Sequence, residues 1–166
     1  GRYTLSANYA DLSALFGALA PESLAPRYNI APSQDILTVA IVDGKKTAAF
    51  RRWGLIPAWA KEEGIGNKLI NARSETVAEK PSFRSAFKKR RCLVPMSGFY
   101  EWKREGKTKE PYFIHTRAPL FAVAGETTTL GKAPIRLERV GRPEIKNVVM
   151  SSKEFDPVNR DLEIRD

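Results

Sequence analysis

The chain has 166 residues, of which 42% are hydrophobic, and it contains three Trp, eight Phe and five Tyr. This length and apolar content fit one folded domain with a real core and exclude a disordered chain. No run approaches the roughly 18 apolar residues that a membrane span needs. No basic and then apolar leader opens the sequence, so we expect an intracellular protein without membrane contact.

The net charge of +9 is unevenly distributed along the chain. Residues 51–110 hold 15 of the 28 Lys and Arg against 7 acids, so +8 of the +9 lies there. Such clustering indicates a polyanionic partner, although a solvated basic face that aids solubility explains it as well. Interleaved aromatic residues favour single-stranded nucleic acid, whose bases stack on rings: Trp53, Trp59, Phe83, Phe87, Phe99, Tyr100 and Trp102.

Cys92 and His115 are the only residues of their kinds. One cysteine excludes an internal disulfide, which fits a reducing compartment. One Cys and one His without a carboxylate cluster predict no metal site, and we expect no cofactor. We interpret Cys92 as inert packing in an apolar strand rather than as a nucleophile, and His115 as a strand residue rather than as a base.

The first third of the chain predicts a strand over residues 1–5 and then a helix from Tyr9 to Ala20, capped by Ser6 or Asn8. Residues 27–34 are expected to be extended, because Ile30-Ala31-Pro32 disfavours the helical region.

A hairpin is predicted next, with strands at residues 36–42 and 46–53 joined through Asp43-Gly44. Residues 61–68 contain two glycines and indicate a mobile loop. Trp59, before this loop, is either a stacking platform or simply packed beside Pro57.

Residues 74–89 predict helical turns broken near Pro81, and the basic run of residues 88–91 either contacts phosphates or is solvated. A buried strand around Cys92, a second hairpin over residues 102–116 with a polar loop at 104–110, and a strand at residues 120–124 follow. Together the elements predict a single mixed α+β domain over residues 1–166, mainly an antiparallel, barrel-like sheet with a few peripheral helices.

Glu101 lies between aromatic residues in the stretch Phe99-Tyr100-Glu101-Trp102. Period-two alternation puts Glu101 on the face of Phe99 and opposite Tyr100. A carboxylate flanked by rings loses part of its hydration, which suits it to general acid/base work. The alternative is a strand glutamate that points into water.

Six motifs in this order resemble the SOS-response-associated peptidase (SRAP) family, whose members recognise abasic sites in single-stranded DNA. They are Gly1-Arg2-Tyr3, Arg27-Tyr28-Asn29-Ile30-Ala31-Pro32, Trp53-Gly54-Leu55-Ile56-Pro57-Ala58-Trp59, Asn71-Ala72-Arg73-Ser74-Glu75-Thr76, Arg91-Cys92-Leu93-Val94-Pro95 and Gly98-Phe99-Tyr100-Glu101-Trp102. The resemblance is strong over residues 1–125 and weak afterwards.

The resemblance implies a DNA-damage protein of the SOS response that forms a covalent DNA–protein crosslink. In the family, the amine of an N-terminal cysteine attacks the sugar aldehyde and its thiol closes a thiazolidine. The resemblance also implies a self-processing peptidase (hydrolase) act that removes the initiator Met, and lyase-like chemistry. We therefore expect a monomeric, cytoplasmic, nucleoid-associated enzyme whose partner is single-stranded DNA with abasic sites.

The resemblance assigns roles residue by residue. Glu101 would shuttle protons and Asn71 would hold the sugar or the terminal residue. Arg2 and Arg73 would bind flanking phosphates. The groove for DNA would be lined by Asn29 and Pro32, which without the family are a turn residue and a strand-end stop; Trp59 would stack on a base.

Two features of the family are not found in this sequence. Members open with Met-Cys-Gly-Arg, so the nucleophilic cysteine is expected just before Gly1. Members also carry an Ile-His-Asp/Glu-Arg-Met-Pro block whose histidine helps catalysis, whereas residues 126–149 contain no histidine and receive no such role.

Three alternatives follow from these observations. If Gly1 is the reacting terminus, its amine forms only an imine, which allows β-elimination and strand nicking. A second reading is a non-catalytic module that binds single-stranded DNA or RNA, with equal affinity for intact and abasic strands. A third is a structural or protein-interaction domain, which predicts no salt-dependent binding of oligonucleotides.

Overall fold

The computed structural model describes residues 1–17, 24–127, 147–151 and 162–165. The expected α+β class, with mostly antiparallel strands and few helices, is confirmed. The elements in chain order are β1 (Arg2–Leu5), α1 (Tyr9–Phe16), β2 (Arg27–Ile30), β3 (Asp35–Val42), β4 (Lys45–Trp53), the 3-10 helix η1 (Glu63–Lys68), β5 (Asn71–Ala72), α2 (Arg84–Lys89), β6 (Arg91–Met96), β7 (Gly98–Glu105), β8 (Thr108–Thr116), β9 (Phe121–Thr127), β10 (Asn147–Ser151) and β11 (Leu162–Arg165).

The first sheet has the order β11-β8-β7-β1-β2 and is antiparallel throughout its described pairs. The amino-terminal strand β1 therefore lies inside the sheet, between β7 and β2. Tyr3 lies opposite both Phe99 and Ile30, and these three side chains share the face that packs on the core. The pairing fixes the register of the whole sheet, because a slip by one residue would turn Tyr3 to the other face.

The second sheet has the order β4-β3-β6-β9-β10-β5. Its described pairs are antiparallel except where β10 runs parallel to β5 and to β4. The β4–β10 pairing consists of two residue pairs, Asn147 with Arg52 and Val148 with Trp53. The sheet thus curls back on itself, which agrees with the barrel-like prediction, but the closure is partial and the other strands form a separate sheet.

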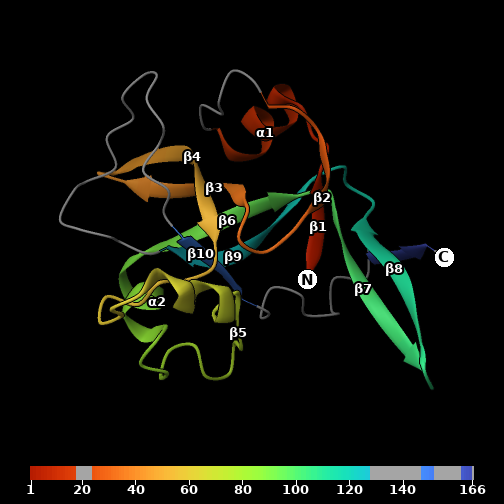
Figure 1. Cartoon of the computed structure of the whole chain (residues 1–166). Helices are drawn as coiled ribbons and strands as arrows, with labels where there is room; N and C mark the ends of the chain where they lie inside the picture. The colour runs from red at the N-terminus through yellow and green to blue at the C-terminus, as the bar shows by residue number, and fades with distance from the viewer. Residues whose placement is uncertain (18–23, 128–146, 152–161, 166) are drawn as a thin grey trace.

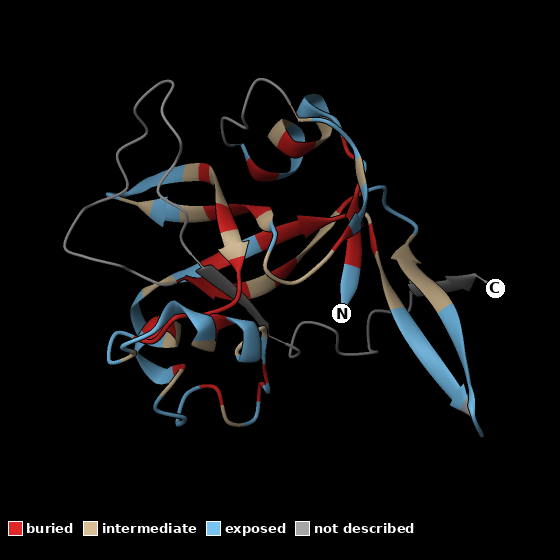
Figure 2. Cartoon of the chain, in the orientation of Figure 1, coloured by how far each residue is buried: buried red, intermediate tan, exposed pale blue. Residues whose placement is uncertain are grey.

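The main core lies between the two sheets and under α1. Figure 2 shows its buried residues at the centre of the molecule, whereas the outer half of the β7–β8 hairpin is exposed. Among its members Tyr3, Ile36, Trp53 and Val94 are at most 1% exposed. Full burial of such side chains stabilises the fold by roughly 1.5–3 kcal/mol each. A smaller cluster lies beneath η1 and α2: Leu55, Ala72, Val77, Phe83 and Ala86.

Helix α1 begins where predicted and ends earlier. Asn8 caps it: the Asn8 side chain accepts a hydrogen bond from the Asp11 backbone N–H, and the Asp11 carboxylate accepts one from the Asn8 backbone N–H. Gly17 ends the helix with a φ of 57°, a left-handed conformation that favours glycine. The rest of the predicted helix, residues 18–20, lies outside the described residues.

The β3–β4 hairpin is confirmed. Val42 pairs with Lys45, so Asp43 and Gly44 alone form the turn, with φ values of 49° and 76°. Positive φ at both positions defines the turn type whose twist matches a two-residue hairpin.

Two predicted loops are wrong. Within residues 61–68, predicted as a loop, η1 forms. The polar loop predicted at residues 104–110 is a two-residue turn, because Glu105 pairs with Thr108 and Gly106 adopts a φ of 60°. The resulting hairpin β7–β8 projects from the body (Figure 1). The helical turns predicted over residues 74–89 and broken near Pro81 are confirmed: turns precede Pro81, and α2 follows it.

Candidate functional site

The free end of β1 lies against the indole of Trp53. A Cβ placed on Gly1 would lie 3.4 Å from Cη2 of Trp53, which is ordinary van der Waals contact. Trp53 is 1% exposed, and its ring meets Tyr3 edge-on at 5.8 Å between centroids. Trp53 Nε1 donates a hydrogen bond of 2.7 Å to the carbonyl of Ile70, which directly precedes Asn71. One side chain thus connects the amino terminus to β5.

Strand pairing places Glu101 beside the same end of β1. Arg2 lies opposite Tyr100 and Tyr3 opposite Phe99, so one further step along both strands puts Gly1 opposite Glu101. Alternation places Gly1 and Glu101 on the core-facing side of the sheet and Arg2 with Tyr100 on the outer side. Glu101 is exposed, however, so the partial desolvation expected from its aromatic neighbours is not found.

Pro32 lies two residues after Ile30, the last residue of β2. The chain turns here through Ser33, whose φ of 70° is unusual for a residue other than glycine. The Ser33 backbone N–H donates to the Trp53 carbonyl at 3.0 Å, and its hydroxyl donates to Asn67 Oδ1 at 2.8 Å. Hydrogen bonds of Ser33 thus tie the turn that contains Pro32 to the end of β4 and to η1.

We give the name amino-terminal corner to Gly1, Trp53, Asn71 and Glu101, together with Pro32. Within it Gly1 contacts Trp53, Trp53 bonds the residue before Asn71, and the strand register puts Glu101 opposite Gly1. Asn71 and Glu101 are exposed and come from different sheets, whereas Trp53 is buried.

Arg2 and Asn29 form a pair on the outer side of the first sheet. Arg2 Nη1 donates a hydrogen bond of 2.8 Å to Asn29 Oδ1, and both residues are exposed. The bond fixes the guanidinium while leaving its other N–H groups able to bind an anion. The structure therefore brings these two predicted DNA-binding residues together, one strand position from Gly1 but on the opposite face.

Arg73 and Trp59 are exposed on loops. Arg73 directly follows β5, where its carbonyl accepts the Thr76 backbone N–H at 3.1 Å. Trp59 is 58% exposed, so the interpretation as a packed ring beside Pro57 is wrong and its flat face is accessible.

Not every basic side chain is exposed at the protein surface. Arg51 is 1% exposed, its guanidinium hydrogen-bonds to Thr38, and burial lowers its pKa. In the basic run 88–91, Arg90 is half-buried and its Nε donates to the Thr127 carbonyl at 2.9 Å, whereas Lys88, Lys89 and Arg91 are exposed. Three side chains of the run are thus exposed to solvent, Arg90 is bonded within the fold, and contact with phosphates stays a prediction.

Cys92 and His115 have the structural surroundings predicted for them. Cys92 is a free, buried thiol in β6, and burial raises its pKa to about 12, which leaves it protonated and unreactive at neutral pH. His115 lies half-buried in β8, with Nδ1 2.9 Å from the Thr116 carbonyl oxygen.

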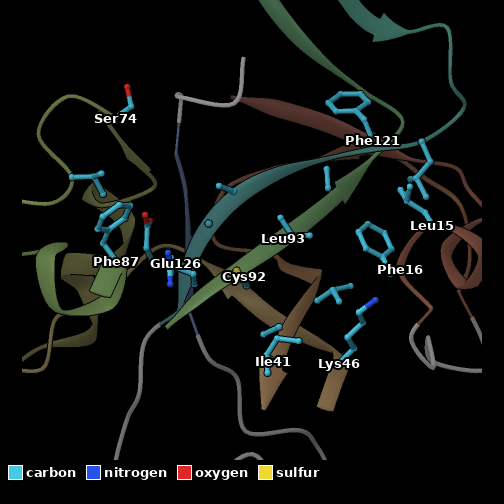
Figure 3. Close-up of a pocket in the computed structure, with 18 of the residues that line it drawn as sticks. Leu15, Phe16, Ile41, Lys46, Ser74, Phe87, Cys92, Leu93, Phe121 and Glu126 are labelled. Carbon is cyan, nitrogen blue, oxygen red and sulfur yellow. The ribbon is translucent and has the colours of Figure 1, made fainter. Parts of the chain in front are cut away.

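A separate apolar groove of about 1030 Å³ lies on the second sheet, over β6 and β9 and beside α1 (Figure 3). Its lining includes Phe16, Ile41, Leu93 and Phe121, and none of the predicted site residues. Glu126 lies at one end of it, 1% exposed, with no hydrogen-bond donor on Oε2 among the described residues. Burial raises the Glu126 pKa to about 7.

Sequence reasoning missed two parts of the site: Trp53, and the turn at Ser33 whose backbone N–H bonds the Trp53 carbonyl. In the sequence Trp53 is one of several aromatic residues and opens a family motif, and neither pattern assigns it a role in the site. The sequence signal for this packing was Gly54, which directly follows Trp53 at the end of the predicted strand. A glycine at such a position permits close approach of another backbone segment.

Neither a metal-binding group of side chains nor a membrane-spanning helix is found within the described residues. No group of three or more His, Cys, Asp or Glu side chains there is placed to hold a metal ion. No helix in that part of the chain is long and apolar enough to cross a bilayer.

The fold defines a class: a small α+β protein with two mainly antiparallel sheets, in which Gly1, before the first strand, contacts a buried tryptophan. The family model described as "SOS response associated peptidase (SRAP)" matches residues 1–140. The chain belongs to this family.

Curated relatives carry a common name. The chain is 50% identical over 131 residues to the abasic site processing protein YoqW of Bacillus subtilis, covering 75% of this chain and 58% of that protein. It is 43% identical over 75 residues to the abasic site processing protein HMCES of Xenopus tropicalis, covering 43% and 22% of the two chains. The matched part of this chain thus spans less than two thirds of these relatives' length.

Solved structures share the fold. A crystal structure of a protein from Bacteroides thetaiotaomicron superposes with a TM-score of 0.72 at 27% identity, covering 90% of this chain and 66% of that one. A second, from Bordetella bronchiseptica, gives a TM-score of 0.69 at 23% identity, covering 98% and 77%. At that identity the second likeness concerns the fold alone.

Proposed function

We propose that this chain recognises abasic sites in single-stranded DNA and joins them covalently through the residue at its amino terminus. The observation that supports the proposal is the amino-terminal corner, where Gly1 contacts Trp53, Trp53 bonds the residue before Asn71, and the strand register puts Glu101 opposite Gly1. The names of the relatives, abasic site processing proteins, supply the substrate class.

The reaction follows from the aldehyde that a baseless sugar exposes when its ring opens. A neutral α-amine, with an ordinary pKa near 7.7–8.0, adds to the carbonyl carbon. Loss of water then gives an imine. A cysteine joined directly before Gly1 would add its thiol to the C=N carbon and return its proton to the nitrogen, closing a five-membered thiazolidine. No oxidant or reductant is needed.

Each residue of the amino-terminal corner is assigned a role from its position relative to the reacting amine and the sugar. Glu101 would take the proton from the attacking amine and return it to the departing hydroxyl. Asn71, whose amide both donates and accepts, would hold a sugar hydroxyl or the terminal residue. Pro32 would close one flank of the sugar's position, and Trp53 would keep water from the floor.

Phosphates beside the baseless sugar would be bound by Arg2, which Asn29 orients, and by Arg73. Trp59 offers an exposed ring for a neighbouring base. No base flipping is required, since the strand is single and the position has no base. The self-processing that removes an initiator Met would free the reacting amine at the same corner.

Crosslinking to a defined oligonucleotide tests the proposal. A chain with Cys before Gly1 is incubated with a single strand carrying one uracil, pretreated with uracil glycosylase, and run on a denaturing gel. We expect a heat-stable adduct that needs no borohydride. The chain beginning at Gly1 should give only a borohydride-trapped adduct and strand nicking. Glu101→Gln should slow adduct formation about 10²-fold, the lower end of general acid–base contributions.

A non-catalytic module for single-stranded nucleic acid remains the competing function, favoured by the exposed basic and aromatic residues. It predicts equal affinity for intact and abasic strands and no adduct under either condition. An adduct with the intact, untreated strand would contradict both functions.

A further inference from the structure

The apolar groove on the second sheet shares no residue with the amino-terminal corner within the described part of the chain. Its floor is one face of the sheet. Val39 pairs with Leu93 and Leu93 with Ala124, so these three side chains lie on the same face, and alternation adds Ile41 and Ala122. All five line the groove. The solvated face of an antiparallel sheet normally carries polar residues, so this apolar face indicates that something covers it.

Three apolar side chains of this groove are open to solvent. Ile41 is 65% exposed, Leu15 of α1 is 51% exposed and Leu93 is 38% exposed. A small ligand generally has most of its surface buried in a closed pocket, which an open strip of this kind does not provide. Contiguous exposed apolar surface is instead typical of contact between proteins. The groove therefore suits a segment of a partner protein, which brings its own cover.

The strands beneath the groove offer no edge to which a partner strand could add. β3, β6 and β9 each lie between two other strands of the sheet. An extended partner laid over them would leave its own N–H and C=O groups unpaired on an apolar floor. A helix pairs these groups within itself, and helices cover sheet faces in many folds. Phe87 of α2 and Phe16 of α1 lie at the two ends of the groove, so helices of this chain already flank it (Figure 3).

One polar group in the groove determines the chemistry of the partner. Glu126 is 1% exposed at the end near Phe87, and its Oε2 has no hydrogen-bond partner among the described residues. Arg91 lies opposite Glu126 in the strand register, but its side chain is exposed and does not bond that oxygen. A donor that enters from the groove would satisfy this buried acceptor. A Lys or Arg of the partner supplies such a donor at the end of an apolar stem that packs along the floor.

We propose that this groove is a docking site for an amphipathic helix of a partner protein. The helix packs its apolar face on Ile41 and Leu93 and reaches Glu126 with one basic side chain. The site goes beyond the proposed function and does not rest on it. Because the groove and the amino-terminal corner share no described residue, the partner helix and the proposed DNA strand do not compete for the same side chains.

Three fluorescein-labelled synthetic peptides test the docking site. Each forms a helix of about four turns with leucine along one face, and the last position of that face is Lys, norleucine or Glu. Anisotropy titrations with the full chain at pH 8 should show the Lys peptide binding about 10-fold more tightly than the Glu peptide. Glu126→Gln should remove this preference and bind the norleucine peptide as the parent does.

Leu93→Asp places a charge on the apolar floor and should weaken the binding of all three peptides about 10-fold or more. Trp102→Asp is the matched control, since Trp102 is an exposed apolar residue outside the groove, and it should bind the peptides as the parent does. Circular dichroism checks that both variants are folded, and the Glu126→Gln comparison stands without them. A Lys peptide with two internal prolines, which cannot form the helix, should not bind.

Four results would overturn the docking site: no binding of any peptide, equal affinity for the Lys and Glu peptides, binding that Leu93→Asp leaves unchanged, or equal binding of the proline peptide. Sedimentation of the chain alone tests the other occupant. Self-association that Leu93→Asp abolishes would assign the groove to a second copy of this chain and would also overturn the proposal.

Discussion

A carboxyl group that burial keeps protonated makes stability depend on pH, and Glu126 is such a group, with no hydrogen-bond partner on Oε2 among the described residues. Its folded pKa of about 7 lies above the ordinary 4.5. Below pH 4.5 the Glu126 carboxyl group is protonated in both the folded and the unfolded state, so its ionisation does not lower the free energy of unfolding. Between these values the unfolded state loses the proton first, so stability falls as pH rises, and above pH 7 the loss is complete.

Glu126→Gln removes this dependence. We expect the variant to be more stable than the parent at pH 8, by up to about 3 kcal/mol, and to differ little in this respect at pH 5. Urea unfolding at both pH values measures the difference. Glu79→Gln, which changes an exposed carboxylate, serves as the control and should show no such pH-dependent gain. An identical difference at pH 5 and pH 8 would contradict the assignment.

Trp53 holds the corner together through one N–H group. Trp53→Phe keeps a ring but loses the hydrogen bond to the Ile70 carbonyl, which should cost about 1 kcal/mol of stability. It should also slow adduct formation about 10-fold or more, because Asn71 loses its anchor. Adduct kinetics and thermal unfolding are measured together. Trp59→Phe keeps an exposed ring and should leave the melting temperature unchanged; equal adduct rates in Trp53→Phe and the parent would refute the positioning role.

At the scale of elements, the backbone that follows β4 packs directly against the backbone of η1. Gly54 adopts a φ of 138°, and a Cβ there would lie 2.4 Å from the Gly66 carbonyl oxygen. Two glycines thus let the end of β4 approach η1 closely, and the Leu55 N–H to Leu69 carbonyl bond of 2.9 Å fixes the loop that leads into β5.

Gly54→Ala should therefore destabilise the chain by about 2–4 kcal/mol, since strained φ and backbone overlap add. Chemical denaturation checks the magnitude. Gly64→Ala in η1 is the comparison, because a Cβ there meets nothing within 4 Å, and its effect should stay within about 0.5 kcal/mol. A Gly54→Ala variant as stable as Gly64→Ala would show that the close approach relaxes easily.

Local signals predicted elements where the deciding contacts are local. The Asp43-Gly44 turn and the Asn8 cap depend on residues a few positions apart, and both were predictable. The 3-10 helix was not, since Gly54 and Gly66 meet across a loop. For the site, the resemblance named Asn71 and Glu101, but the register that puts Glu101 beside Gly1 joins strands distant in sequence, and the burial of Trp53 depends on that packing.

At the scale of the whole molecule, the charge of +9 predicts that the affinity for single-stranded DNA falls as the salt concentration rises. For single strands, log Kd changes with log salt by about 0.7 for each phosphate contacted. Arg2→Gln and Arg73→Gln should each reduce that slope by about 0.7, whereas Lys45→Gln at the β3–β4 turn should not. Titrations of a fluorescent oligonucleotide at several salt concentrations measure the slopes. Equal slopes in all three variants would mean that the strand avoids the corner.

Because β1 lies between two partner strands and Gly1 rests on a buried indole, any residue joined before Gly1 must leave through the corner. An affinity tag or carrier protein placed there would fill the position proposed for the sugar and shift the residue that reacts. Recombinant material for activity assays therefore calls for a traceless amino end, and a preparation with a tag retained there serves as a ready-made blocked form of the protein.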